Sequence, residues 1–382
     1  MEANTKIPFL RSSNDLPGPL PTSSQIRESP TIIHGVDPYA DKRVVIVGPY
    51  VVKYGKGVSL LEGQNLLFIE ENFPQVPAPK LYAMWRDAEE VFLVMEQIQG
   101  QTLDTLWPTL GDEDKVIILN KLRDIFESLH SPPGQGFFGS VLKGPIPYHL
   151  FWDSDGDPTI TGPFEAASDM IYGLAKRSRA NSALNHKDPY LAEFFERNLA
   201  PALDDRSATF CHSDVQRKNI IIENLPTHLT GFENVRVVLL DWEVAGWYPS
   251  YWEYVAAFIA FIWDDDWPKR VEDFLPIYGS EAAQSARAGD AGQLLTGLLK
   301  CARCRNWRKE RQEMWAGSRP VLNVKGVLGD NKLVVRAAHM MMRRGLLQQS
   351  QAVPATAPNV PGEDAARAIR GGPRDVENDR GE

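Results

Sequence analysis

The sequence is poor in cysteine, with only three in 382 residues. So few cysteines cannot form the disulfide framework of a small secreted protein, and they suit a reducing compartment. Cys301 and Cys304 have CxxC spacing, but a structural zinc needs four ligands and no second pair exists. We therefore interpret this spacing as chance.

Long apolar runs are also missing. The longest, from Tyr254 to Trp263, is far shorter than the roughly 20 residues that span a bilayer. The N-terminal segment lacks the uninterrupted apolar core of a signal peptide. These features predict a cytoplasmic protein that does not act on membranes.

Positive charge is in deficit, because the formal net charge is -9. An acidic protein is repelled by the phosphate backbone, so we expect no nucleic-acid partner. Twelve Lys or Arg residues nevertheless gather between Lys300 and Arg344, opposed by three acidic residues. This basic region is either a solvated helix face or a surface that attracts an anionic substrate or partner. Nothing in the sequence indicates the oligomeric state.

The chain is longer than one hydrophobic core usually holds, which predicts two lobes. Residues 1–30 are rich in Pro, Ser and Asn and are expected to form a flexible N-terminal arm. Residues 351–382 have almost no large apolar side chains, so we expect a disordered tail. Between them we expect an N-lobe over 31–98 and a C-lobe over 99–350.

The first lobe is predicted to be rich in strands. Two β-branched runs separated by Gly48-Pro49 predict a hairpin, and a helix over 59–72 should end at the prolines that follow. The predicted strands cover 43–47, 50–53, 80–85 and 91–95. After Gly100 the apolar spacing becomes helical, with an irregular stretch at 131–165 and helices over 114–130, 188–199 and 252–263. The fold class is therefore α+β, with a small strand-rich lobe before a larger, mainly helical one.

The chemistry is carried by two polar loops between apolar runs. His212-Ser-Asp214 is followed five residues later by Asn219, and Asp241 comes after another apolar run. Phosphoryl transfer needs a carboxylate that receives the proton of the acceptor hydroxyl, and hard oxygen ligands that hold magnesium against a triphosphate. The HxD sequence with Asn at +5 has the spacing of a kinase catalytic loop.

These stretches resemble the aminoglycoside phosphotransferase and choline kinase-like family, especially its fungal-type members. The similarity covers roughly residues 30–280, with weaker similarity to about 345. It implies a protein-kinase-like two-lobed fold and transfer of the γ-phosphate of ATP, with Mg²⁺, to a hydroxyl of a small molecule. The resemblance rests on the sequence segments VKYGKGV, VPAPKLY, FLVMEQIQG, HSDVQRKNIII and LLDWEVAGWYPSYWEY.

The resemblance implies a role for each matching residue. Asp214 would be the catalytic base, and Asn219 and Asp241 would bind magnesium. Lys53 would contact the α and β phosphates, with Glu62 as its partner on the following helix. The alternatives are an edge-strand lysine whose ammonium reaches solvent for Lys53, and a solvent-facing helix charge for Glu62.

The inter-lobe hinge would lie at Val94 to Ile98. There the carbonyl of Glu96 and the N–H of Ile98 would pair with adenine, and Met95 would stand at the back of its pocket. The alternative is an ordinary strand end, in which Met95 serves only packing.

Some features depart from protein kinases. No GxGxxG loop precedes Lys53, Gln216 replaces the usual lysine, and the DFG and APE sequences are absent. Glu243 either contacts the metal ligands without binding the ion itself, or caps the next helix. The aromatic group from Trp242 to Trp252 reads as packing, with a cation-binding box as the alternative.

The acceptor is left open. Asp169 and the run Asp264 to Asp266 would suit a cationic acceptor such as an aminoglycoside, whereas the basic region would suit an acidic one. A nucleotide-binding pseudokinase or regulatory scaffold is the alternative function, with a protein kinase as a further one.

Overall fold

The computed structural model describes residues 6–37, 39–203, 207–224, 231–260 and 266–279. The chain divides into two units, Met1–Trp307 and Arg308–Glu382, and the second lies wholly outside the described residues. The expected tail, the basic region and the Cys301–Cys304 pair also lie outside them. The fold below therefore concerns the first unit.

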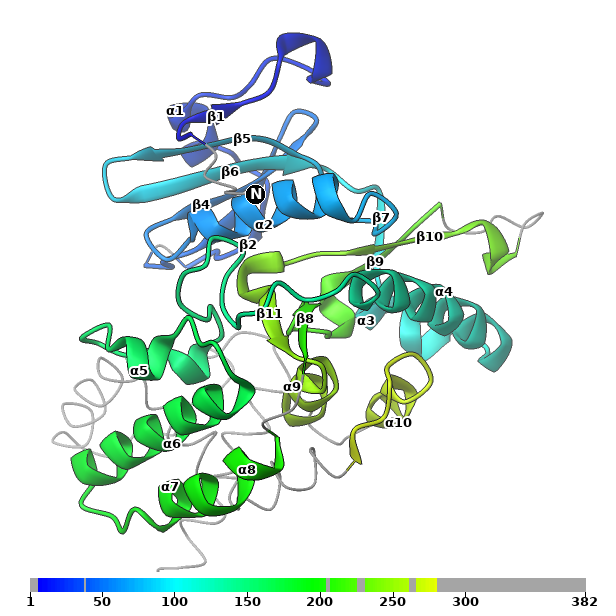
Figure 1. The fold of residues 1–382 in the computed structure, drawn as a ribbon. Helices are drawn as coiled ribbons and strands as arrows, with labels where there is room; N and C mark the ends of the chain where they lie inside the picture. Colours follow the sequence, from blue (N-terminus) through cyan, green and yellow to red (C-terminus); the bar gives the residue numbers. More distant parts are fainter. Residues whose placement is uncertain (1–5, 38, 204–206, 225–230, 261–265, 280–382) are drawn as a thin grey trace, which may run out of the picture. The chain divides into compact units, whose positions relative to one another are not determined.

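The N-lobe is built on a six-stranded antiparallel sheet with the strand order β1-β5-β6-β4-β3-β2 (Figure 1). β3 and β4 form the predicted hairpin, and Gly48, the first of the two residues between them, has a φ of 58°. The predicted strands agree with the observed ones to within two residues. The strands are β1 (Phe9–Leu10), β2 (Ile32–His34), β3 (Arg43–Val47), β4 (Tyr50–Gly55), β5 (Leu81–Asp87) and β6 (Glu90–Glu96).

Alternation along β4 decides where its lysine lies. Tyr50, Val52 and Tyr54 are buried in one apolar cluster, whereas Val51 packs against the other. Because successive side chains of a strand point to opposite faces, Lys53 shares the face of Val51. Helix α2 (Leu60–Asn72) packs on β5 and β6, and Ser59 caps it by accepting the N–H of Leu61 at 3.1 Å. This confirms the helix predicted over 59–72.

The expectation of a flexible arm over residues 1–30 is wrong for its described part. β1 pairs with β5 at the edge of the sheet, and α1 (Ser23–Arg27) begins with a capping box made by Thr22 and Gln25. The side chain of Ile26 is fully buried in the cluster on the outer face of the sheet. These short elements gain their stability from the sheet beneath them, which local composition does not reveal.

The chain leaves the N-lobe after Glu96 and enters a second sheet at once. β7 (Gly100–Thr102) pairs with β9 (Ile220–Glu223), which pairs with β10 (Arg236–Leu239). Residues 97–99 are therefore the connection between two sheets, and the predicted boundary at 98/99 falls within it. A separate two-stranded ribbon joins β8 (Ala208–Cys211) to β11 (Gly246–Pro249).

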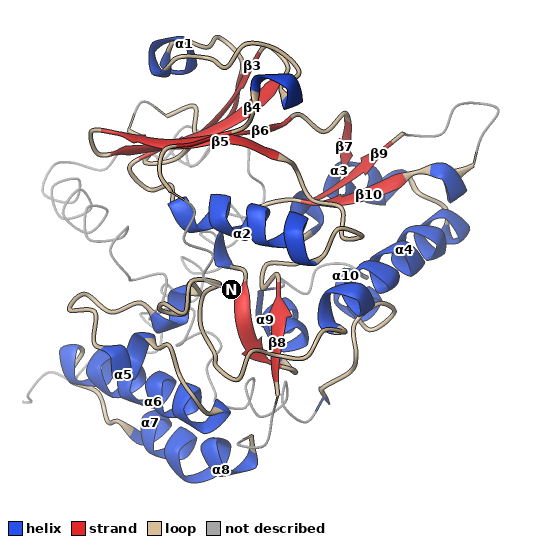
Figure 2. Cartoon of the chain, turned by 45° about the horizontal axis from the view of Figure 1, so that its top comes forward, coloured by secondary structure: helices blue, strands red, loops and turns tan. Residues whose placement is uncertain are grey.

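Helices are the longest elements of the described C-lobe (Figure 2). The apolar face of α4 (Asp112–His130) is buried at Ile118, Leu122, Ile125 and Leu129, as its spacing predicts. The stretch 131–165 is irregular apart from short helical turns, and the helix expected over 188–199 becomes π-helical from Phe195 to Leu199. The other helices are α3 (Leu103–Leu106), α5 (Pro158–Thr161), α6 (Ala167–Leu184), α7 (Tyr190–Phe194), α8 (Ala200–Ala202), α9 (Trp252–Ala260) and α10 (Trp267–Val271).

Across the described ranges, no helix combines the length and the apolar character that crossing a bilayer requires.

Candidate active site

The catalytic loop lies between β8 and β9 and is tied to the segment that precedes Asp241. The backbone N–H of Asp214 donates to Nδ1 of His212 at 3.1 Å, so the ring proton lies on Nε2, which contacts the carbonyl of Leu240 at 2.8 Å. The N–H of Leu240 donates to the carbonyl of Asn219 at 2.8 Å. These bonds place the two polar loops side by side, with His212 in the structural role of a loop support.

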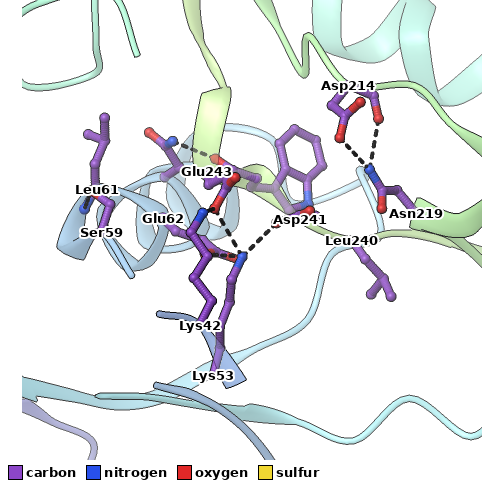
Figure 3. A network of polar contacts seen from close by, with 12 residues as sticks. Lys42, Lys53, Ser59, Leu61, Glu62, Asp214, Asn219, Leu240, Asp241 and Glu243 are labelled. Atoms are coloured by element: carbon purple, nitrogen blue, oxygen red, sulfur yellow. Dashed lines mark hydrogen bonds and ion pairs between the residues drawn. The ribbon is translucent and has the colours of Figure 1, made fainter. Parts of the chain in front are cut away.

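Both carboxylate oxygens of Asp214 accept a hydrogen bond from a neutral amide. Nδ2 of Asn219 donates to Oδ2 at 2.8 Å (Figure 3). Nε2 of Gln216 donates to Oδ1. Two amides orient the carboxylate without adding a positive charge that would weaken it as a base. Because Asn219 donates through nitrogen, its side-chain oxygen is left to act as an acceptor.

Asp214 acts electrostatically on the segment at Tyr148 and His149. Burial, followed by the charge of Asp214, raises the pKa of Tyr148 above its usual range. Burial lowers the pKa of His149, while Asp214 opposes that change. Both side chains are therefore neutral neighbours of the carboxylate at neutral pH.

Lys53 lies at the centre of a cluster of carboxylates. Its Nζ is 2.7 Å from Oε2 of Glu62, 2.6 Å from Oδ1 of Asp241 and 3.3 Å from Oε2 of Glu243. Burial alone would lower the pKa of Lys53, but the three carboxylates outweigh it and the pKa is raised. Burial would likewise raise the pKa of Asp241, and Lys53 reverses this, so that the pKa is lowered. The cluster thus favours a charged lysine beside an ionised Asp241.

Glu62 is fully buried on the first turn of α2, facing Lys53. Burial raises the pKa of Glu62 although Lys53 opposes the shift. Its position rules out the alternative of a solvent-facing helix charge. The predicted pair of Lys53 and Glu62 is thus brought together by the structure.

Asp241 itself has a left-handed backbone, with a φ of 63°, and begins a short 3₁₀ turn over Trp242–Val244. The adjoining turn is fastened to α2 by Asn65. The fully buried amide of Asn65 donates to the carbonyls of Trp242 at 2.7 Å and Ala245 at 3.2 Å. Helix α2 therefore positions both Glu62 and the loop of Asp241.

Glu253, on the first turn of α9, binds the backbone of the catalytic loop. Its carboxylate is buried and accepts the backbone N–H groups of His212 at 2.6 Å and Ser213 at 2.8 Å. Ser213 has a φ of 66°, so the loop turns sharply just before Asp214. The buried carboxylate fixes this turn.

The oxygen donors fit a hard divalent cation. Glu62, Asp241 and Glu243 each offer one carboxylate oxygen, and these atoms lie within 4.8 Å of one another. The side-chain oxygen of Asn219 adds an amide donor from the adjacent loop. Carboxylate and amide oxygens are the ligands that magnesium takes in proteins.

The expected hinge residues lie at the end of β6. Met95 is buried and pairs with Val51 of β4, two residues before Lys53 on that strand. The N–H of Glu96 donates to the carbonyl of Lys80 at 2.9 Å, and its carboxylate accepts the N–H of Lys80 at 3.1 Å. Ile98 is half-buried in the connection.

Sequence reasoning missed four residues of this site. Lys42, whose Nζ lies 2.5 Å from Oε2 of Glu243, comes from the segment that precedes β3. Glu253 gave one usable signal, a charged residue within an otherwise apolar stretch, whereas Asn65 gave none because it follows the polar residues Glu62 and Gln64. The fourth, Gln216, was noted only as a departure from protein kinases.

Of the acidic acceptor candidates, the two that the structure describes, Asp169 and Asp266, have no hydrogen bond or ion pair with the residues of this site. Asp266 accepts Nε1 of Trp107 at 2.8 Å and lies 3.7 Å from the ammonium of Lys115, which is a structural contact. Asp169 is exposed on the first turn of α6. Asp264 and Asp265 lie outside the described residues.

The aromatic side chains Trp242, Trp247, Tyr248, Tyr251 and Trp252 are all buried, as the packing interpretation predicts.

The model of the phosphotransferase enzyme family matches residues 59–295. The chain belongs to this family. The membership confirms the expected kind of enzyme, a phosphotransferase with an alcohol group as acceptor, and the expected α+β, kinase-like class of fold. The matched segment contains the catalytic loop, Asp241 and Glu62, but begins after Lys53.

Solved structures similar to this phosphotransferase are distant from it. A thermostable mutant of aminoglycoside phosphotransferase APH(4)-Ia, in a ternary complex with ADP and hygromycin B, is 14% identical over 75% of this chain and 90% of its own, with a TM-score of 0.47. The streptomycin–ATP complex of APH(2")-IIa is 13% identical over 77% and 90%, with a TM-score of 0.42. APH(3'')-Id from Streptomyces rimosus is 16% identical over 67% and 87%, with a TM-score of 0.36. No curated protein sequence matches the chain.

Proposed function

We propose that this phosphotransferase moves the γ-phosphate of ATP, with Mg²⁺, to a hydroxyl group of a small molecule. The observation that carries the proposal is the Asp214 carboxylate, held by two amides next to the loop of Asp241 and Lys53. A base beside a cationic, carboxylate-rich site is what transfer from a triphosphate requires.

In this proposal Asp214 receives the proton of the acceptor hydroxyl. The hydroxyl oxygen forms a bond to the γ-phosphorus, the bond from that phosphorus to the β-bridging oxygen breaks, and ADP leaves. The amides of Asn219 and Gln216 keep the carboxylate in the orientation in which it meets the hydroxyl. Positioning of this kind accounts for much of the catalysis of phosphoryl transfer.

Lys53 anchors the α and β phosphates, and Glu62 holds the lysine in place from α2. Asn219 and Asp241 would hold the magnesium ion, with Glu243 nearby. The ion would supply positive charge that offsets the charge of the phosphates. The backbone of Glu96 and Ile98 pairs with adenine, and Met95 lines the back of that pocket.

The acceptor lies on the side of Asp214 near Tyr148 and His149. Both side chains are neutral there. They supply hydrogen-bonding groups and ring surface rather than charge, which suits a hydroxylated molecule bound through polar contacts. The geometry supports a small-molecule alcohol as the class of acceptor.

The test is ATP consumption by the purified protein with magnesium across a panel of amino alcohols, sugars, aminoglycosides and hydroxylated metabolites. The Asp214→Ala variant is the blank. Turnover with one class of acceptor that is lost in the variant supports the proposal. Binding of MgATP without turnover of any acceptor favours a regulatory role, and absence of ATP binding refutes the proposal.

A further inference from the structure

The segment that joins β2 to β3 is held beside β4 by three glycines. The N–H of Gly57 donates to the carbonyl of Asp41 at 2.9 Å. A Cβ atom on Gly55 would lie 2.2 Å from that same carbonyl oxygen, and one on Gly35 would lie 2.2 Å from the carbonyl oxygen of Lys42. Gly55 and Gly35 also have positive φ angles, of 134° and 76°. A side chain at Gly35 or Gly55 would clash with the backbone of Lys42 or Asp41, so both positions require glycine. The close contacts hold the backbone of Lys42 in place.

From this position Lys42 reaches the loop after Asp241. Its Nζ lies 2.5 Å from Oε2 of Glu243, a residue 201 positions further along the chain. The Nζ of Lys53 lies 3.3 Å from the same oxygen atom. Two ammonium groups therefore converge on one carboxylate oxygen, as Figure 3 shows. Both are partly shielded, with side-chain exposures of 28% for Lys42 and 10% for Lys53.

The charges of this cluster are poised for an anion that carries several charges. Among the residues that the structure describes, Lys42 has one carboxylate partner, Glu243, and shares it with Lys53. A triphosphate anchored by Lys53 would bring phosphate oxygens next to Lys42 as well. Phosphate carries more charge than one carboxylate and accepts stronger charge-assisted hydrogen bonds, so an exchange of partner is favoured.

The geometry points to Lys42 as a second phosphate-binding lysine, which Glu243 holds in position until the nucleotide binds. This inference rests on the proposed function and deepens it. The ligand class is a nucleoside di- or triphosphate, and the contact is to its terminal phosphates. Lys42 thereby supplies a charged contact where no GxGxxG loop covers the phosphates.

The test compares ATP, ADP and adenosine by titration calorimetry of the full chain, first in EDTA and then with magnesium. The Lys42→Ala variant should bind ATP and ADP about tenfold more weakly, because a charge-assisted contact is lost, and adenosine within about twofold of the parent protein. Lys56→Ala is the matched control. That lysine is exposed after β4 and pairs with Glu89, so its removal should leave all three affinities unchanged.

The Glu243→Gln variant distinguishes two roles of Lys42. The lysine either binds phosphate or only joins its own segment to the loop after Asp241 through an ion pair. If Lys42 binds phosphate, the amide removes a competing charge, and ATP in EDTA binds as tightly as to the parent protein or more tightly. If the Lys42–Glu243 pair only fastens the segments, both variants lose the same affinity, which overturns the inference. An equal loss of adenosine and ATP affinity in Lys42→Ala overturns it too, because adenosine has no phosphate.

The proposed function and this inference fail in different ways. A parent protein that does not bind ATP removes both. A parent protein that binds ATP while Lys42→Ala and Lys56→Ala behave alike removes only the role of Lys42.

Discussion

Replacing Glu253 by glutamine should lower kcat without weakening the binding of the nucleotide. The carboxylate is 1% exposed and accepts two backbone N–H groups, those of His212 and Ser213, at 2.6 and 2.8 Å. Glutamine keeps one carbonyl acceptor and turns an amide donor toward the second N–H. One charge-assisted bond is lost and one buried donor is left unpaired.

The magnitude follows from these two contacts. A hydrogen bond to a charged group contributes about 1.5–3 kcal/mol, and an unsatisfied buried donor costs about 1–3 kcal/mol. Partial relaxation of the loop offsets part of this, so the free energy of unfolding should fall by about 2–4 kcal/mol. Displacing a catalytic group by about 1 Å costs on the order of a hundredfold in rate, so kcat should fall by about that factor.

The assay is ADP release with an acceptor from the panel above, together with thermal unfolding. The KM for MgATP should stay within about threefold, because Glu253 contacts the catalytic loop and none of the phosphate-binding groups. Glu272→Gln is the matched control, since Glu272 is exposed and only accepts the hydroxyl of Tyr254 at 2.8 Å. It should change neither stability nor rate appreciably.

A Glu253→Gln variant that unfolds at the parent temperature and turns over at the parent rate would refute the reasoning. A variant that loses MgATP affinity as strongly as kcat would also contradict it, since that pattern indicates general loss of the fold.

Other substitutions test the remaining parts of the site. Asp214→Asn should abolish turnover while MgATP binding by calorimetry stays within about threefold, because the amide cannot accept the proton. Lys53→Met should raise the KM for MgATP at least about tenfold in steady-state kinetics, since the phosphate anchor is lost. Asn65→Ala should lower the free energy of unfolding by about 2 kcal/mol in a urea titration, because two buried carbonyls lose their donor. Deleting residues 1–28 should lower the midpoint of thermal unfolding, since it uncovers the apolar face that Ile26 fills.

Much of the fold could be predicted from local patterns in the sequence. The strand and helix positions of the N-lobe followed from β-branched runs, from the apolar residues of the segment 59–72 and from the prolines after Asn72, which are all local signals. The role of residues 9–27 did not, because β1 has only two paired residues and α1 is stabilised by burial of Ile26 against a sheet formed later in the sequence. Composition reports the average polarity of a segment and says nothing about one buried side chain.

The same division holds for the site. Asp214, Asn219 and Asp241 could be found because the spacing along one loop and its neighbour is set by the chemistry. Lys42, Asn65 and Glu253 could not be assigned, because their partners lie 201, 177 and 41 residues away. Contacts at such separations depend on how the lobes fold, and no period or spacing in one sequence encodes them.

Two backbone angles near the reacting groups set a limit on how this enzyme can be improved. Ser213 and Asp241 both have left-handed φ angles, a conformation that costs a residue other than glycine about 1 kcal/mol or more. A library selected for heat tolerance should therefore enrich glycine at Ser213, where the exchange removes no charged group. At Asp241 the same exchange relieves the backbone but removes the 2.6 Å ion pair with Lys53 and a proposed magnesium ligand. Selection for heat tolerance and selection for turnover should therefore both accept glycine at Ser213 and both reject it at Asp241.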